Sequence, residues 1–131
     1  VCSSDLLEAG LSWGVDWDKP GGFIGREALL AQRDEGLTRR LVQFRLDDPE
    51  PLLYHDEPIL RDGVLVGRTT SGMYGHTVGA ALGMGYVSHE RGTPRDEVIA
   101  ANFELDVNGT RVSATASYRP FYDPGSERIR T

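Results

Sequence analysis

Apolar and polar residues alternate with a period of two along much of this chain, which predicts a protein built mainly from β-strands. The clearest case lies at 41–47, where Val42, Phe44 and Leu46 fall on one side and polar residues on the other. We expect a strand with one buried face there. The other expected strands span residues 11–17, 58–61, 64–68, 80–87, 103–107 and 110–115.

The dipeptide Asn108-Gly109 separates the last two of these strands, and such a dipeptide favours a two-residue hairpin turn. Counting outward from the turn places the apolar residues of both strands on one face. On the other face the count puts Asp106 opposite Arg111, which predicts an exposed ion pair that contributes well under about 1 kcal/mol.

A second turn signal, Asp62-Gly63, lies earlier in the chain. A two-residue turn there puts Leu60 opposite Leu65 and Ile59 opposite Val66. These two pairs fall on opposite faces, so both faces of the hairpin are partly apolar. That is the pattern of a barrel strand that also packs against another domain.

Helical spacing replaces alternation at 25–35, where Ile24, Ala28 and Ala31 recur every three to four residues and Gly36 follows the end. About six short strands, two tight hairpins and one N-terminal helix predict a mainly β fold, a small antiparallel Greek-key-like barrel. We expect Trp13 and Trp17 to lie against the helix.

We divide the chain into four expected segments. They are a cloning or sequencing scar at 1–6, a segment of strand and helix at 7–36, the barrel at 37–118 and an extended tail at 119–131.

Composition excludes several classes of function. The 131 residues suit one domain, and the net charge of −6 argues against binding nucleic acid through its phosphates. The single cysteine excludes an internal disulfide, and no apolar run is long enough to cross a membrane. The spacing of His55, His76 and His89 matches no metal-ligand pair, so we expect no metal site.

The glycine-rich stretch 67–79 has two interpretations. In one it presents Tyr74 and His76 to a ligand or a partner domain; in the other it is a barrel corner whose polar groups satisfy one another. A Ser71–His76 nucleophile system lacks an orienting third group and an oxyanion site. On these residues alone the chain is a non-catalytic β module.

A series of short motifs runs along the chain: Phe23-Ile24-Gly25-Arg26-Glu27-Ala28-Leu29, Arg40-Leu41-Val42, Pro58-Ile59, Asp62-Gly63, Val66-Gly67, Thr70-Ser71-Gly72 with Tyr74, and Gly85-Tyr86-Val87. In this order and spacing they resemble the C-terminal part of the folate-dependent aminomethyltransferase family, which includes the glycine-cleavage T-protein. Three further motifs, Leu46-Asp47-Asp48, Tyr74-Gly75-His76-Thr77 and Tyr122-Asp123-Pro124, are more similar to its dimethylglycine and sarcosine dehydrogenase branch. The resemblance implies that residues 7–36 are a junction segment from the preceding folate-binding domain.

The resemblance implies a barrel that ends a three-domain folate-binding unit. That unit transfers a one-carbon group from a small amine substrate to tetrahydrofolate, and in the dehydrogenase branch an upstream domain with FAD first oxidises the amine. The preceding folate-binding domain of the same chain is then the partner of this barrel, in the bacterial cytoplasm or the mitochondrial matrix.

The resemblance also suggests site residues. The family's catalytic aspartate has no counterpart here, so we expect no catalytic residue and an inactive isolated chain. Lys19, Arg119 and Tyr122 are the candidates for folate binding. The candidates for the domain junction are Ser71, Tyr74 and His76.

Three other hypotheses stay open at this point. The barrel could serve only as an interdomain or oligomerisation module, with no ligand of its own. It could belong to a stand-alone glycine-cleavage T-protein, without a flavin domain. It could also belong to a relative that uses folate to modify RNA, although the acidic charge argues against that.

Overall fold

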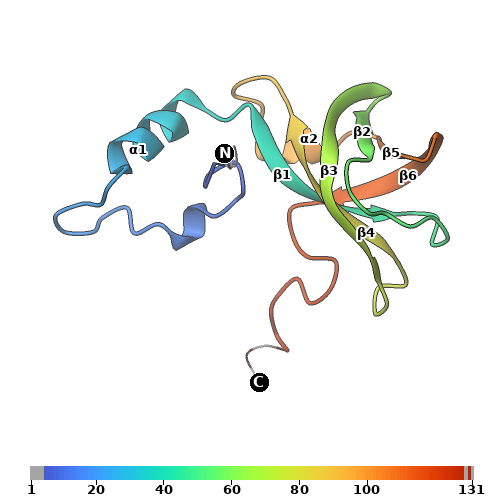
Figure 1. Cartoon of the computed structure of the whole chain (residues 1–131). Helices are drawn as coiled ribbons and strands as arrows, with labels where there is room; N and C mark the ends of the chain where they lie inside the picture. The colour runs from blue at the N-terminus through green and yellow to red at the C-terminus, as the bar shows by residue number, and fades with distance from the viewer. Residues whose placement is uncertain (1–4, 129, 131) are drawn as a thin grey trace.

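Six antiparallel strands close into a barrel in the computed structural model, which describes residues 5–128 and 130 (Figure 1). The order around the barrel is β1-β4-β3-β2-β5-β6, and β6 pairs back onto β1. The elements are a 3-10 helix Ser12–Gly14, α1 Arg26–Glu35, β1 Arg39–Leu46, β2 Pro58–Arg61, β3 Val64–Gly75, β4 Ala80–Ser88, α2 Arg95–Ile99, β5 Phe103–Val107 and β6 Thr110–Ser117. The expected mainly β barrel, with β1 beside β4 as in a Greek key, is confirmed.

The barrel encloses a core built from the inward residues of every strand. Val42, Phe44 and Leu46 are buried as the alternation predicts, and the rings of Phe44 and Phe103 lie 5.3 Å apart. Burying a side chain such as Phe44 stabilises the fold by about 1.5–3 kcal/mol. The barrel therefore has a core of its own.

The β5–β6 hairpin has the predicted register, with Asp106 opposite Arg111. The predicted ion pair between those two residues is wrong. The Arg111 guanidinium lies 4.0 Å from the carboxylate of Glu104, whereas the Asp106 carboxylate accepts a hydrogen bond from the backbone N–H of Gly109 at 2.7 Å. Asp106 closes the turn because a turn amide lies nearer to it than the arginine side chain does.

The β2–β3 hairpin departs from its predicted register after one pair. Leu60 lies opposite Leu65 as predicted, but Ile59 pairs with Gly67 rather than Val66, because a bulge interrupts the ladder. Close packing explains why Gly67 takes that place. A Cβ added to Gly67 would lie 1.9 Å from the carbonyl oxygen of Tyr86 on β4, so only glycine fits.

Residues 5–38, which we call the N-terminal arm, lie to one side of the barrel (Figure 1). The expected strand at 11–17 is wrong, since this part consists of turns and the short 3-10 helix. The expected helix is confirmed as α1. The carbonyl of Trp17 accepts a hydrogen bond from Arg26, so this tryptophan contacts the helix as expected, but Trp13 is 83% exposed.

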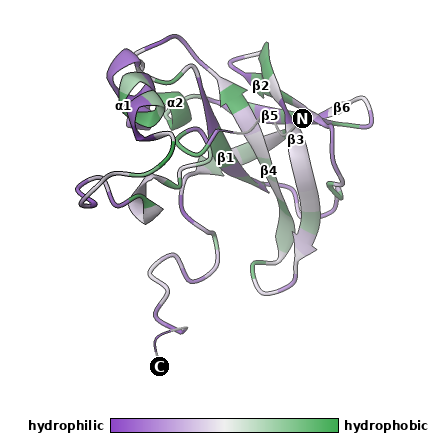
Figure 2. Ribbon diagram, turned by 60° about the vertical axis from the view of Figure 1, so that its left-hand side comes forward, coloured by the Kyte–Doolittle hydropathy of each residue, from purple (hydrophilic) through white to green (hydrophobic). Residues whose placement is uncertain are grey.

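Polar contacts hold the arm to the barrel. Arg39 of β1 forms an ion pair with Glu8, whose carbonyl accepts a hydrogen bond from the backbone N–H of Leu41 at 2.8 Å. Arg91 donates to the carbonyl of Gly36 at 3.0 Å. α1, which the structure describes in full, has no buried residue, although apolar residues lie along it (Figure 2). Of the expected scar at 1–6, residues 1–4 lie outside the described residues.

Candidate functional site

Two of the three candidate folate-binding residues lie in the C-terminal tail, residues 118–128. Arg119 lines a cavity of about 330 Å³ beside α2 and the end of β6. Tyr122 is partly exposed, and its hydroxyl accepts a hydrogen bond from Arg128 at 2.7 Å. Lys19 lies in a turn of the N-terminal arm, where its backbone N–H donates to the carbonyl of Asp16 at 3.4 Å. Tyr122 does not line the cavity that Arg119 lines. Among the described residues, the structure therefore does not bring the three candidates together in one site.

Arginine side chains face three aromatic rings of the tail, an arrangement that attracts the cation to the ring face. The distances from guanidinium carbon to ring centroid are 4.3 Å for Arg95–Tyr118, 5.7 Å for Arg45–Phe121 and 5.7 Å for Arg128–Tyr122. Arg95 belongs to α2 and Arg45 to β1. These contacts fix the beginning of the tail against the barrel.

The candidate junction residues lie on and just beyond β3. The rings of Tyr74 and His76 meet edge to face at 5.3 Å, while Ser71 lies further back along the strand opposite Met84. The glycine-rich stretch is strand as far as Gly75, with a bulge between Thr69 and Ser71. Tyr74 and His76 therefore lie at the end of the barrel where β3 turns into β4. Their contact with another domain stays a prediction.

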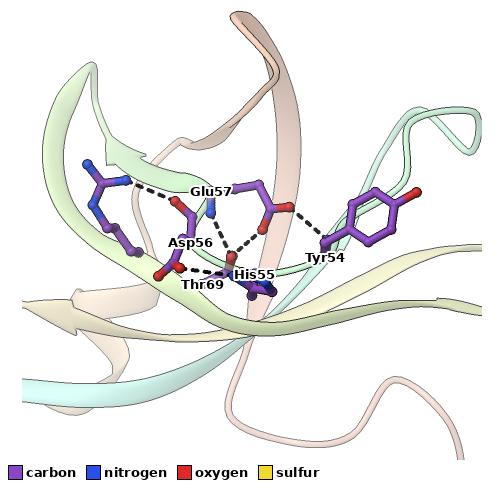
Figure 3. A network of polar contacts seen from close by, with 6 residues as sticks. Tyr54, His55, Asp56, Glu57 and Thr69 are labelled. Carbon is purple, nitrogen blue, oxygen red and sulfur yellow. Dashed lines mark hydrogen bonds and ion pairs between the residues drawn. The ribbon is translucent and has the colours of Figure 1, made fainter.

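A polar network joins the loop before β2 to β3 (Figure 3). The Thr69 side chain is almost fully buried, and its hydroxyl accepts from the backbone N–H of Glu57 at 3.0 Å and donates to the Glu57 carboxylate. The same carboxylate accepts from the backbone N–H of Tyr54 at 2.7 Å. The backbone N–H of Asp56 donates to the Thr69 carbonyl at 2.8 Å.

These contacts determine the charge of Glu57. Burial raises the pKa of its carboxyl, but the hydrogen bonds from Thr69 and from backbone N–H groups outweigh burial, and the pKa lies below its ordinary value of 4.5. A general acid needs the opposite shift, towards the working pH. The Glu57 carboxylate therefore stabilises the contact between the loop before β2 and strand β3. The sequence analysis missed it because the two residues are twelve positions apart.

Metal-binding chemistry finds no support in the described part of the chain, where no group of three or more His, Cys, Asp or Glu side chains comes together. His55 lies 2.9 Å from the Asp56 carboxylate, and His89 contacts the carbonyl of Glu90 at 2.9 Å.

No helix among the described residues is long and apolar enough to span a membrane.

Comparison with known proteins decides the family. The family model described as the glycine cleavage T-protein C-terminal barrel domain matches residues 39–123, from the start of β1 into the tail. This chain belongs to that family. The match covers all six strands of the T-protein-type barrel, and residues 5–38 of the N-terminal arm lie outside it.

Curated relatives of this T-protein-type barrel are much longer than the chain. It is 41% identical over 126 residues to 4-methylaminobutanoate oxidase (formaldehyde-forming) of Paenarthrobacter nicotinovorans, covering 96% of this chain and 15% of that protein. It is 36% identical to an aminomethyltransferase of Rippkaea orientalis, covering 88% and 30%. It is 34% identical to human mitochondrial sarcosine dehydrogenase, covering 95% and 14%.

A solved structure supports the fold. The crystal structure of glycine cleavage system aminomethyltransferase T from Bartonella henselae matches with a TM-score of 0.74 at 22% identity, over 93% of this chain and 33% of that one. The chain is thus the C-terminal barrel of aminomethyltransferase-like proteins, and homologues include members of the oxidase and dehydrogenase branch that the motifs favour.

Proposed function

We propose that this chain forms one wall of a tetrahydrofolate cavity, which a preceding folate-binding domain completes in a longer aminomethyltransferase-like protein. The observation that carries the proposal is the exposed apolar surface of the N-terminal arm, where Ile24 is fully exposed and Trp13 nearly so. The barrel is closed and has its own core, so the arm can bury this surface only against another part of the protein. Residues 7–36 are then the junction segment, 37–118 the barrel and 119–131 the tail.

The relatives suggest the reaction. Two are named for 4-methylaminobutanoate and for sarcosine, which are both secondary amines with an N-methyl group. We propose that FAD in an upstream domain would accept a hydride from the N-methyl group of such an amine, which would give an iminium ion. The iminium carbon would then bond to two nitrogens of tetrahydrofolate, and the demethylated amine and one proton would leave as 5,10-methylenetetrahydrofolate forms. The bacterial cytoplasm or the mitochondrial matrix suits this chemistry.

The barrel's contribution in this proposal is binding and positioning. Lys19 and Arg119 supply positive charge for the anionic glutamate of folate, and Tyr122 supplies an aromatic surface and a hydroxyl. Holding the acceptor nitrogen near the electrophilic carbon can supply much of the rate without any reactive group in this chain. The acid that assists the transfer belongs to the preceding domain.

The test uses the longer protein that contains this chain, with 5-formyltetrahydrofolate as a stable probe. We expect Lys19→Ala and Arg119→Ala each to weaken binding about tenfold, the effect of losing a hydrogen bond to a charged group. Arg111→Ala is the matched control, because Arg111 is exposed and faces away from the core on β6. Unchanged folate affinity in both variants, with assembly lost, would contradict the proposal.

A second candidate function, an interdomain or oligomerisation module, has an observation of its own in favour. Val64 and Leu65 are 65% and 58% exposed beside the β2–β3 turn, and Met73 further along β3 is 77% exposed. Apolar residues gathered on one strand suit a protein contact. If these residues hold subunits together, Leu65→Asp should lower the molar mass of the assembled longer protein, measured by light scattering. Its affinity for folate should stay the same.

A further inference from the structure

Four residues from distant parts of the chain meet at the end of the barrel that α2 covers. Arg40 belongs to β1, Arg61 to β2 and Arg95 to α2, while Tyr118 directly follows β6. The Arg61 guanidinium donates to the carbonyl of Glu97 at 2.9 Å, which ties it to α2. Arg95 stacks on the Tyr118 ring at 4.3 Å. The fold rather than the local sequence brings these side chains together.

Buried hydrogen-bond donors without partners are concentrated in this cluster. Among the described residues, five buried side-chain nitrogen or oxygen atoms have no hydrogen-bond partner in the protein, and three of them are the Nε atoms of Arg40 and Arg61 and the hydroxyl of Tyr118. An unpaired buried polar group destabilises a protein until an acceptor is supplied. Arg40, Arg61 and Arg95 all act electrostatically on Tyr118, so an acceptor bound beside Tyr118 lies within the field of all three arginines.

The electrostatics of the cluster favour an anion. Burial raises the pKa of Tyr118 above its ordinary value of 10, against the lowering effect of Arg40, Arg95 and Arg61, while Asp96 adds to the rise. Tyr118 therefore stays protonated at neutral pH and can donate. Three arginines against one aspartate make the site positive in a protein whose net charge is −6.

We propose that this end of the barrel holds a carboxylate-binding site formed by the guanidinium groups of Arg40, Arg61 and Arg95 and the hydroxyl of Tyr118. The adjoining cavity of about 330 Å³, which Arg95 and Tyr118 line, leaves room for a small ligand. Planar guanidinium groups match the two oxygens of a carboxylate. Asp96 in the same cavity lining disfavours a doubly charged phosphate more than a singly charged carboxylate.

The carboxylate can come from a free small molecule or from an acidic side chain in another part of the longer protein. Both sources offer the same group to the same donors. The proposal does not depend on folate binding: the cavity shares Arg119 with the proposed folate wall, but neither Lys19 nor Tyr122 lines it. Its test therefore uses no folate.

The experiment follows the Nε–Hε signals of Arg40 and Arg61 by NMR in the 131-residue chain, which has a closed core of its own. Sodium propionate, a singly charged carboxylate, is the probe, added at constant ionic strength, and inorganic phosphate is added in a parallel titration. We expect a saturable shift of both signals with propionate and weaker binding of phosphate. Arg95→Gln should weaken propionate binding about tenfold or more, and Tyr118→Phe by a smaller factor.

Controls distinguish the two possible sources of the carboxylate, and they show whether the NMR shifts come from the proposed site. Arg111→Gln, on the exposed side of β6, should bind propionate as the unchanged chain does. If an acidic side chain of the longer protein is the ligand, the two signals are already shifted there, and propionate no longer moves them. Absence of a saturable shift in the 131-residue chain, equal shifts in Arg95→Gln, or tighter binding of phosphate would each overturn the proposal.

Discussion

Gly72 offers the sharpest test of how the barrel is packed. The loop before β2 crosses β3 at this residue, and a Cβ added to Gly72 would lie 2.5 Å from the Leu53 Cβ and 2.6 Å from its carbonyl carbon. Both distances are below those that real Cβ atoms show, and one involves backbone. The Gly72→Ala variant must therefore displace the loop, because no rotation of the Leu53 side chain relieves the contact.

The size of the effect follows from what the displacement disrupts. Overpacking a well-packed site costs about 1–3 kcal/mol. Leu53 is 2% exposed, and exposing a leucine adds a cost of about 1.5–3 kcal/mol if the loop lifts away. We expect Gly72→Ala to lower the free energy of unfolding by about 1–3 kcal/mol if the loop shifts in place, and by about 2.5–6 kcal/mol if Leu53 is exposed as well. Either loss is a large part of the roughly 5–15 kcal/mol typical of a domain.

The assay is urea unfolding followed by far-UV circular dichroism. Tryptophan fluorescence does not suit it, because Trp13 and Trp17 both lie in the N-terminal arm rather than in the barrel. Gly14→Ala is the matched control, since a Cβ there meets nothing within 4 Å. A loss below about 0.5 kcal/mol in Gly72→Ala, or an equal loss in the control, would refute the packing argument.

Four further predictions rest on the same structure. Thr69→Val should lower the free energy of unfolding by about 1–3 kcal/mol at pH 7, measured by urea titration, because it removes both hydrogen bonds between its hydroxyl and Glu57. Folding lowers the pKa of Glu57, so its ionised carboxylate stabilises the folded chain above pH 4.5, and this stabilisation is lost as the pH falls below that value. Glu57→Gln should therefore flatten the acid side of the plot of unfolding free energy against pH. An unchanged slope in that variant would contradict this assignment. Ile24→Asp should leave the stability of the 131-residue chain unchanged within about 0.5 kcal/mol and lower the yield of folded longer protein, since Ile24 is fully exposed here. The 131-residue chain should form no 5,10-methylenetetrahydrofolate from tetrahydrofolate and an N-methyl amine in the presence of an oxidant, and turnover above the rate without protein would show that it holds a reactive group.

Most of the barrel could be predicted from local pattern, because in a strand with one buried face every second residue is apolar. Val42, Phe44 and Leu46 show this on β1, and Asn108-Gly109 determines the register of the last hairpin. The same rule failed at 11–17, where alternation exists without a neighbouring strand to pair with. Alternation indicates that a segment can be a strand, whereas pairing depends on the rest of the fold.

The features that sequence reasoning missed depend on contacts between distant residues. The bulge at Gly67 follows from the approach of the Tyr86 carbonyl, which no local signal records. α2 is five residues long, too short to show a helical period, although its Val98 is fully buried. The carboxylate site draws one residue each from β1, β2, α2 and the segment after β6, so only the folded chain reveals it.

Closure of the barrel by its last hairpin has a consequence for synthesis on the ribosome. Strands β1 to β4 can pair with one another as soon as residue 88 has emerged, but β1 and β2 then remain open edges until the β5–β6 hairpin fills the gap between them. Open edges recruit strands from other chains. A chain that stops before Phe103 therefore has two unpaired strand edges, β1 and β2. We expect premature termination in this segment to cause aggregation rather than to leave a smaller stable domain.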